Sequence, residues 1–240
     1  MASFGRVALL LSAILVASTA SHAQSGTVTA RVAVVRNTSS KQQNAEVVMW
    51  LSPLHAQSNL YSFPEDTKPA RLAQKNKTFE PHLLAVRAGS VVEFPNLDPF
   101  FHNVFSLFEG KRFDLGLYEA GSTRTVRFDR PGVSYIFCNI HSQMSAVIVA
   151  LDTAYYAVSS RDGSVAIANV PPGRYLLQVW HEGTSPQSLN TLRREVVVTT
   201  GDNSLGVLRI PEDEQAVAHK NKYGRDYDEP QPPSPAYPQP

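Results

Sequence analysis

The chain has 240 residues, with 22 basic and 21 acidic side chains and a formal net charge of +1 at pH 7. This balance gives no electrostatic reason to expect nucleic acid as a partner, and no basic block suggests binding to a membrane surface. The length suits one large domain or two small ones.

The first 23 residues have the organisation of a secretory signal peptide. One basic residue, Arg6, precedes the apolar run Val7–Val16, and the small residues Ser21-His22-Ala23 follow. The apolar run is too short to span a bilayer, and the final residues are typical of a cleavage site. We therefore expect a cleaved Sec-type signal, a mature chain that begins at Gln24, and a periplasmic protein with no membrane insertion after signal removal. Loss of Arg6 leaves 22 − 1 = 21 basic against 21 acidic residues, so the mature chain is neutral.

Two β-rich runs come next, separated by a turn. Thr27–Val35 alternates with valines at a period of two, and Glu46–Leu51 is rich in β-forming residues. The stretch Ser52–Ala70 contains three prolines and many polar residues, which is typical of a loop. Two strands alone bury too little apolar surface to be stable in water, so both must pair with strands further along the chain.

A dense series of strands fills residues 71–151. Turn-forming pairs such as Ala88-Gly89 and Glu109-Gly110 separate the strands, and no helical periodicity of convincing length occurs. This pattern favours a Greek-key β-sandwich or barrel. The predicted strands are Leu83–Val86, Ser90–Phe94, His102–Phe108, Arg124–Phe128, Val133–Cys138 and Ser145–Leu151.

Residues 154–210 are again β-rich, and the chain then changes character. After Glu212 the sequence becomes polar, and six of its 17 prolines follow Glu229. This composition predicts a disordered, proline-rich tail over residues 213–240. The strands predicted before it are Tyr155–Val158, Val165–Val170, Tyr175–Trp180, Arg194–Val198 and Leu205–Ile210.

The only cysteine of the chain lies in a cluster of metal-binding residue types. Cys138, His141 and Met144 fall within seven consecutive residues. Thiolate and thioether donors select copper(I), and imidazole binds copper in either oxidation state. A lone cysteine in an oxidising compartment is either an inert buried thiol or a residue with a specific function. The neighbouring histidine and methionine favour a metal ligand.

Three further segments stand out: Val86–Phe94, Asn96–Val104 with its His-Asn-Val sequence, and Pro131–Cys138, which runs into the ligand loop. Together they resemble the cupredoxin family of blue copper proteins, most closely its amicyanin and plastocyanin branch. The resemblance covers Arg71–Leu151, and the short Cys-x-x-His-x-x-Met spacing matches the amicyanin-like branch. It implies an all-β fold with a cupredoxin Greek-key domain at residues 71–151.

A His₂Cys site with an axial methionine needs one more histidine besides His141. The resemblance supplies it as His102, because His-Asn-Val places this histidine at the start of a strand. That strand can bring the histidine to the ligand loop if it lies beside the strand that ends at Cys138. The family resemblance implies that the amide of Asn103 hydrogen-bonds across to the loop, and that redox partner proteins dock near His141. It implies one type 1 copper ion per chain, with the ligands His102, Cys138, His141 and Met144.

The remaining histidines are expected to have structural or surface roles. His55 lies in a loop, His82 follows a proline at the start of a strand, and His181 ends a predicted strand. Even with His219 they are too few for the second metal site of a multicopper oxidase or nitrite reductase, so we expect no enzyme. Met49 is expected to lie in a core.

A second resemblance concerns the segments Asp162–Val165 and Pro171–Tyr175, which look like the turns of the carboxypeptidase regulatory-like, transthyretin-like β-sandwich. That family usually opens with two strands that residues 152–210 lack. We therefore expect residues 27–60 and 152–210 to form one discontinuous sandwich, with the cupredoxin domain inserted. The alternative is two sequential domains with an N-terminal extension on the cupredoxin. A chain that lacks residues 71–151 and still folds would support the insertion.

The leading hypothesis for function is a periplasmic type 1 copper protein that carries single electrons between redox partners. The alternative is a copper-binding or partner-docking module without an electron-carrier role. Methionine- and histidine-rich tracts would favour copper delivery, and the sequence has none. The chain also resembles periplasmic proteins of the methylamine utilization type, but a site motif alone identifies no partner.

Overall fold

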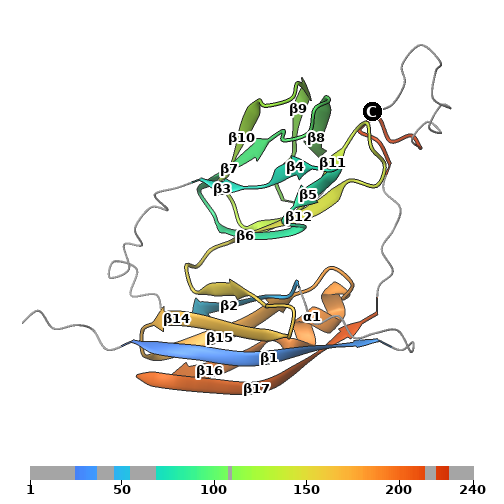
Figure 1. Cartoon of the computed structure of the whole chain (residues 1–240). Helices are drawn as coiled ribbons and strands as arrows, with labels where there is room; N and C mark the ends of the chain where they lie inside the picture. The colour runs from blue at the N-terminus through green and yellow to red at the C-terminus, as the bar shows by residue number, and fades with distance from the viewer. Residues whose placement is uncertain (1–24, 37–45, 55–68, 108–109, 214–219, 227–240) are drawn as a thin grey trace, which may run out of the picture.

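The computed structural model describes residues 25–36, 46–54, 69–107, 110–213 and 220–226, and Figure 1 shows two β-rich bodies, one above the other. Within these residues the only helix is the short α1 (Pro186–Leu192), so the all-β prediction is confirmed. The predicted signal peptide (residues 1–23), His55 and His219 lie outside the described residues. In the described part of the chain, no helix is both long and apolar enough to cross a bilayer.

The lower body in Figure 1 is a sandwich built from both ends of the chain, and we call it the split sandwich. One sheet has the strand order β14-β1-β17, and the other has the order β13-β2-β15-β16. The two N-terminal strands therefore pair with strands that follow residue 155. The strands are β1 (Gly26–Arg36), β2 (Val48–Pro53), β13 (Tyr156–Val158), β14 (Ser164–Val170), β15 (Gly173–Trp180), β16 (Arg194–Val198) and β17 (Gly201–Glu212).

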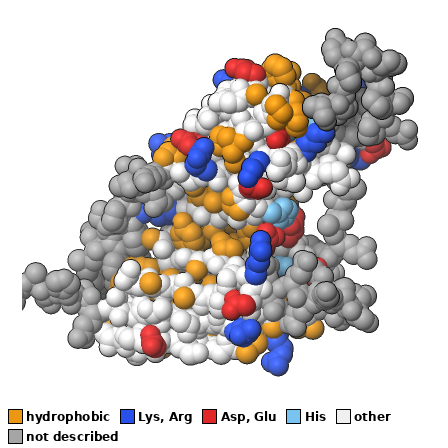
Figure 2. Space-filling view, in the orientation of Figure 1, with side chains coloured by type: hydrophobic (Ala, Val, Ile, Leu, Met, Phe, Trp, Pro, Cys, Tyr) orange, Lys and Arg blue, Asp and Glu red, His pale blue; other side chains and the backbone are white. Residues whose placement is uncertain are grey.

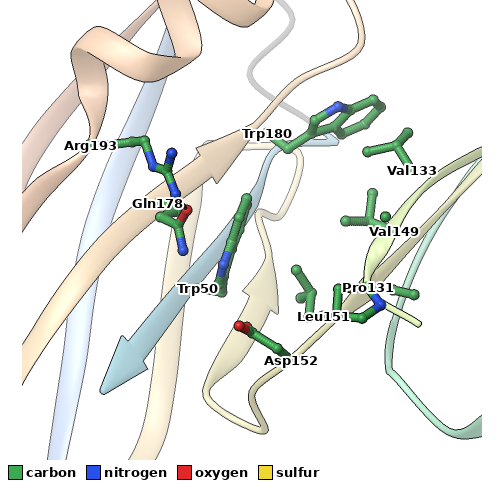
Figure 3. A pocket seen from close by; sticks show the side chains of 11 residues that line it. Trp50, Pro131, Val133, Val149, Leu151, Asp152, Gln178, Trp180 and Arg193 are labelled. Carbon is green, nitrogen blue, oxygen red and sulfur yellow. Dashed lines mark hydrogen bonds between the residues drawn. The ribbon is translucent and has the colours of Figure 1, made fainter. Parts of the chain in front are cut away.

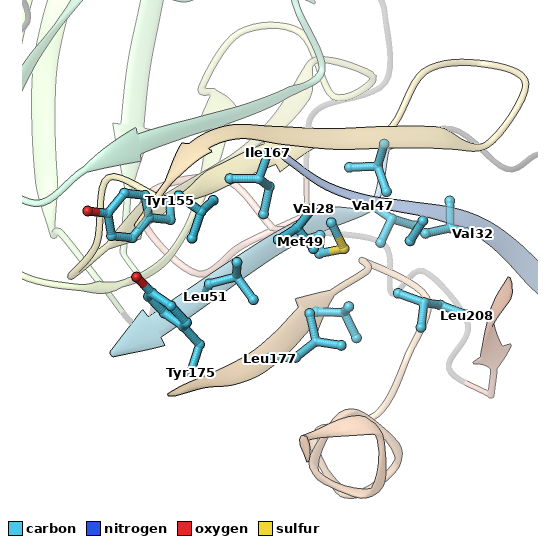
Figure 4. Packing of buried hydrophobic residues seen from close by; sticks show 14 of the residues in the cluster. Val28, Val32, Val47, Met49, Leu51, Tyr155, Ile167, Tyr175, Leu177 and Leu208 are labelled. Carbon is cyan, nitrogen blue, oxygen red and sulfur yellow. The ribbon is translucent and has the colours of Figure 1, made fainter. Parts of the chain in front are cut away.

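Aliphatic side chains fill the space between these two sheets. Side chains of β1 alternate between the two faces, which buries Val28 and Val32 completely. Figure 4 shows them in one cluster with Met49 and Leu177, which come from the opposite sheet. Met49 is fully buried, so its predicted place in a core is confirmed.

The upper body comprises residues 70–151, and we call it the central body. Two sheets, of order β10-β7-β3 and β6-β12-β11-β8-β9, enclose a second core, and β4 and β5 form a separate hairpin. All six strands predicted here are present, and β3, β4, β5 and β9 are additional. The strands are β3 (Ala70–Arg71), β4 (Ala73–Lys75), β5 (Thr78–Glu80), β6 (Leu83–Arg87), β7 (Ser90–Pro95), β8 (His102–Ser106), β9 (Phe113–Tyr118), β10 (Thr123–Phe128), β11 (Gly132–Cys138) and β12 (Ser145–Leu151).

A third hydrophobic cluster joins the two bodies, and Figure 2 shows hydrophobic side chains gathered between them. Val48 and Trp180 of the split sandwich pack there with Val149 and Leu151 of β12. A pocket of about 240 Å³ lies beside this cluster, and Figure 3 shows Trp50 and Trp180 on one side of it. Burial of apolar surface from both bodies favours a fixed relative placement.

A histidine and a glutamate link the two bodies at this boundary. The His82 Nδ1 atom lies 3.1 Å from the carbonyl oxygen of Ser145, and its Nε2 atom lies 2.7 Å from Oε2 of Glu182. A carbonyl oxygen and an ionised carboxylate accept hydrogen bonds only, so both contacts are satisfied when the ring carries a proton on each nitrogen. The hydrogen bond to Glu182 raises the pKa of His82 above its usual 6.5, although burial acts in the opposite direction.

Replacement of Glu182 by glutamine is expected to remove a pH-dependent part of the stability. Because the folded-state pKa of His82 is raised, its contribution is fully present below about pH 6.5 and is lost as the pH rises through the raised value. Both side chains are about one-third exposed, so we expect a loss of roughly 0.5–1 kcal/mol at pH 6 and almost none at pH 9.

Urea unfolding of wild type and Glu182→Gln at both pH values measures this difference. Glu80→Gln is the matched control, because Glu80 pairs with Lys75 at the surface of the central body. An equal loss at pH 6 and pH 9 would contradict the role given to His82.

Candidate metal centre

Three potential ligands meet at one end of the central body. His102 is the first residue of β8 and Cys138 is the last residue of β11, and these two strands pair antiparallel with Cys138 opposite Val104. The loop after Cys138 is tight, because the Met144 N–H donates to the His141 carbonyl and the Cys138 N–H donates to the Met144 carbonyl. Strand pairing therefore places His102, and loop closure places His141.

The distances fit a single metal ion. The Nδ1 atoms of His102 and His141 each lie 3.6 Å from the Cys138 Sγ atom, and the three atoms lie within 4.8 Å of one another. A first-row ion with bonds of about 2.3 Å to sulfur and about 2.0 Å to nitrogen would hold such donors about 3.6 Å apart at angles of about 110–120°. Two imidazoles and a thiolate are donors that suit copper.

The surroundings of Cys138 favour the ionised, thiolate form of its side chain. Cys138 and His102 are both fully buried. Burial disfavours the charged thiolate, but contacts with His102 and then His141 outweigh it and lower the pKa of Cys138 to about 5. Ionised sulfur is the form that binds a metal, so the group is ready to bind at neutral pH.

Met144 is fully buried and belongs to the same hydrophobic cluster as Cys138. Its backbone closes the ligand loop, as described above. The ring of Phe100 stands edge-on to both histidine rings, with centroid distances of 5.3 Å to His102 and 5.6 Å to His141. Phe100 therefore packs against both histidines of the cluster.

Asn103 reaches the ligand loop through its backbone. Its carbonyl oxygen accepts a hydrogen bond of 2.9 Å from the Asn139 N–H, and its own N–H helps to lower the pKa of Cys138. The side-chain amide instead donates to Oδ1 of Asp114 on β9, at 2.6 Å. The expected tie between β8 and the loop therefore exists, but backbone atoms make it, and the side-chain amide bonds Asp114 instead.

The sequence analysis did not identify Asp98 as part of the site. Its Oδ2 atom lies 2.9 Å from the His102 Nε2 atom, and its side chain is almost completely buried. Burial raises the pKa of Asp98, but hydrogen bonds from Lys77, His102 and Asn76 outweigh this effect and lower it. In the sequence Asp98 lies four residues before His102, but this spacing alone does not predict a contact between them.

A C-terminal segment, residues 220–226, also reaches the site. The Lys222 N–H donates to the side-chain oxygen of Asn139 at 2.9 Å, and Lys222 Nζ lies 2.8 Å from Oδ2 of Asp114. Asp213 accepts hydrogen bonds from Ser185. These residues of the predicted tail make defined contacts, and the rest of residues 213–240 lie outside the described part of the chain.

The other described histidines do not join the cluster. His82 contacts Glu182 as described above, and the Nδ1 atom of His181 lies 3.1 Å from Oγ1 of Thr184. Within the described residues, the group of histidine, cysteine and acidic side chains able to hold a metal is His102, Cys138 and His141.

No family model matches the sequence, and no curated protein matches it. Among solved structures, the copper-containing nitrite reductase of Thermus scotoductus is 23% identical over 36% of this chain and 23% of its own, with a TM-score of 0.34. A purple cupredoxin from Nitrosopumilus maritimus is 20% identical over 34% of this chain and 99% of its own, with a TM-score of 0.31. Amicyanin from Paracoccus versutus is 18% identical over 38% of this chain and 86% of its own, with a TM-score of 0.32.

The chain thus spans about a quarter of the nitrite reductase. These similarities are confined to about a third of this chain, and they are too low to assign an activity to it.

Proposed function

We propose that this protein is a periplasmic type 1 copper protein that carries single electrons between redox partners. The observation that carries the proposal is the convergence of two Nδ1 atoms on a buried, ionisable thiol. One copper ion per chain would supply one-electron redox chemistry by alternating between its two oxidation states. Its ligands would be His102, Cys138, His141 and Met144, with the methionine as the weak axial donor.

The chain's contribution is to hold these donors rigidly. His102 and Cys138 are fixed by paired strands, and the loop that carries His141 is closed by its own backbone hydrogen bonds. A rigid donor set changes little when the charge of the ion changes, which favours fast electron transfer. The short loop is the reason for placing the chain in the amicyanin-like branch.

Partner proteins are proposed to dock around His141, which is partly exposed. Four large apolar side chains near the cluster are exposed by 47–59%. Two come from the segment between β7 and β8, one from the ligand loop and one from β9, where it lies opposite Asn103. These side chains are proposed to form the core of the docking surface, with polar side chains around it. They are Leu97, Phe101, Leu117 and Ile140.

The split sandwich is proposed to act as a docking or spacing unit of the transthyretin-like type. No metal ligand of the proposed set comes from it. The alternative function, a copper-binding or partner-docking module without electron traffic, predicts copper binding without rapid redox exchange.

The decisive experiment is to purify the mature protein, add copper(II), and record visible and EPR spectra followed by voltammetry. We expect an intense blue thiolate band, a narrow copper hyperfine splitting and a reversible one-electron wave. A colourless protein rejects the type 1 site. A blue protein that exchanges electrons only slowly supports the alternative. Turnover of nitrite or dioxygen would contradict the role of a carrier.

A further inference from the structure

A buried carboxylate stands behind the His102 ring, on the side away from Cys138. The Asp98 Oδ2 atom is 2.9 Å from Nε2 of His102, and the exposed fractions of the two side chains are 5% and 0%. An ionised carboxylate can only accept, so Nε2 must carry a proton. When the ring gives up its second proton to bind a metal, the lone pair is then on Nδ1, the atom that lies 3.6 Å from Cys138 Sγ.

Two backbone N–H groups hold Asp98 in place independently of the histidine. The Asn76 N–H donates to Oδ1 at 2.6 Å, and the Lys77 N–H donates to Oδ2 at 3.0 Å. Both donors belong to the turn between β4 and β5, with φ values of 55° and 56°. Consecutive left-handed residues are typical of a tight hairpin turn. The hairpin therefore holds the carboxylate in place, and its position does not depend on the His102 ring alone.

Burial of this charge would be costly without compensation. Three hydrogen bonds, from Asn76, Lys77 and His102, compensate it. A fixed negative charge next to a ligand stabilises copper(II), the more highly charged ion, more than copper(I). The same hydrogen bond also fixes the ring orientation and the tautomer.

We infer that Asp98 is a positioning residue, which presents Nδ1 of His102 to the metal and biases the site toward the oxidised ion. This inference rests on the proposed function. The anchoring hairpin makes β4 and β5 part of the metal site, although neither strand contributes a ligand.

The first test is the reduction potential of the copper-loaded mature protein and its Asp98→Asn variant. Asparagine retains an acceptor oxygen and loses the charge. We expect the ratio of copper(II) to copper(I) affinity to fall at least tenfold, which equals a rise of 59 mV for a one-electron couple. Asp129→Asn is the matched control, because Asp129 is a surface carboxylate paired with Lys111 and should leave the ratio unchanged. If the Asp98→Asn protein is blue and has the same reduction potential as Asp129→Asn, the inference is wrong.

The second test needs no metal. In the copper-free protein, NMR should show a slowly exchanging Nε2–H proton on His102, and Asp98→Ala should make its exchange at least tenfold faster. The absence of a slow Nε2–H proton in the wild type overturns the inference, whether or not any variant folds. If wild type shows the slow proton but never turns blue, the proposed function fails and the link between Asp98 and His102 stands.

Discussion

Replacement of Cys138 by serine is expected to abolish the blue colour of the copper-loaded protein completely. The intense band arises from charge transfer between a thiolate and copper(II), and a hydroxyl oxygen cannot supply it. No other cysteine can substitute, because the chain has only one. Residual copper bound by His102 and His141 should give a weak absorption and a wide hyperfine splitting in the EPR spectrum.

The structure also predicts that this loss does not come from unfolding. Serine is slightly smaller than cysteine, so it fits the same space, and its buried hydroxyl would face the Nδ1 atoms of His102 and His141. We expect a stability change of about 1 kcal/mol, measured by thermal unfolding of the copper-free proteins. Ser145→Ala, just beyond the ligand loop, is the control that should stay blue. A Cys138→Ser protein that keeps the intense band would rule out Cys138 as the ligand.

Much of the strand pattern could be predicted because it is local. Valines at alternate positions mark β1, and the buried runs of β11 and β12 lie between clear turn signals. The ligand loop is equally local, since Cys138 and His141 are three residues apart on one tight turn. His102 required a different signal, the His-Asn-Val sequence, because it reaches the cluster through strand pairing.

Short strands were missed because they depend on distant partners. β3 has two residues and exists through its parallel pairing with β7, about twenty residues later. β4 and β5 have three residues each, too few to show a period. In β9, Gly116 adopts a left-handed φ of 67°. No apolar period of useful length exists in β3, β4 or β5, whereas β9 does have alternating apolar residues, at Phe113, Leu115 and Leu117, and the sequence analysis did not use them.

The helix α1 was missed for a related reason. Ser185 caps it by accepting a hydrogen bond from the Ser188 N–H, and Pro186 occupies its first turn. These are typical signals of a helix start. The helix has seven residues and buries none of them, so its sequence lacks the long apolar stripe from which a helix is predicted.

The contact between Asp98 and His102 could not be predicted from the neighbouring sequence. Its geometry depends on the N–H groups of Asn76 and Lys77, which lie more than twenty residues earlier. The Lys222 contacts depend on a segment about eighty residues after the ligand loop. Ligands can be recognised from residue type and spacing, whereas the groups that orient them are assembled by the fold.

Replacement of Met144 by leucine is expected to preserve the blue colour and to raise the reduction potential by at least about 59 mV, a tenfold change in relative affinity. The proposed axial sulfur donates electron density that stabilises copper(II), and leucine removes it. Leucine has a similar volume, so the fully buried site should lose less than about 1.5 kcal/mol of stability. Redox titration of the two copper-loaded proteins measures the shift.

The chain offers a matched control for this change. Apart from Met1, Met49 is the other methionine of the chain, and it is fully buried in the core of the split sandwich. Met49→Leu makes the same chemical change far from the ligands, so it should affect stability but not potential. If Met144→Leu leaves the potential unchanged, the thioether is only a core side chain and the site has three ligands. If both variants shift the potential equally, the effect reflects the fold and not the metal.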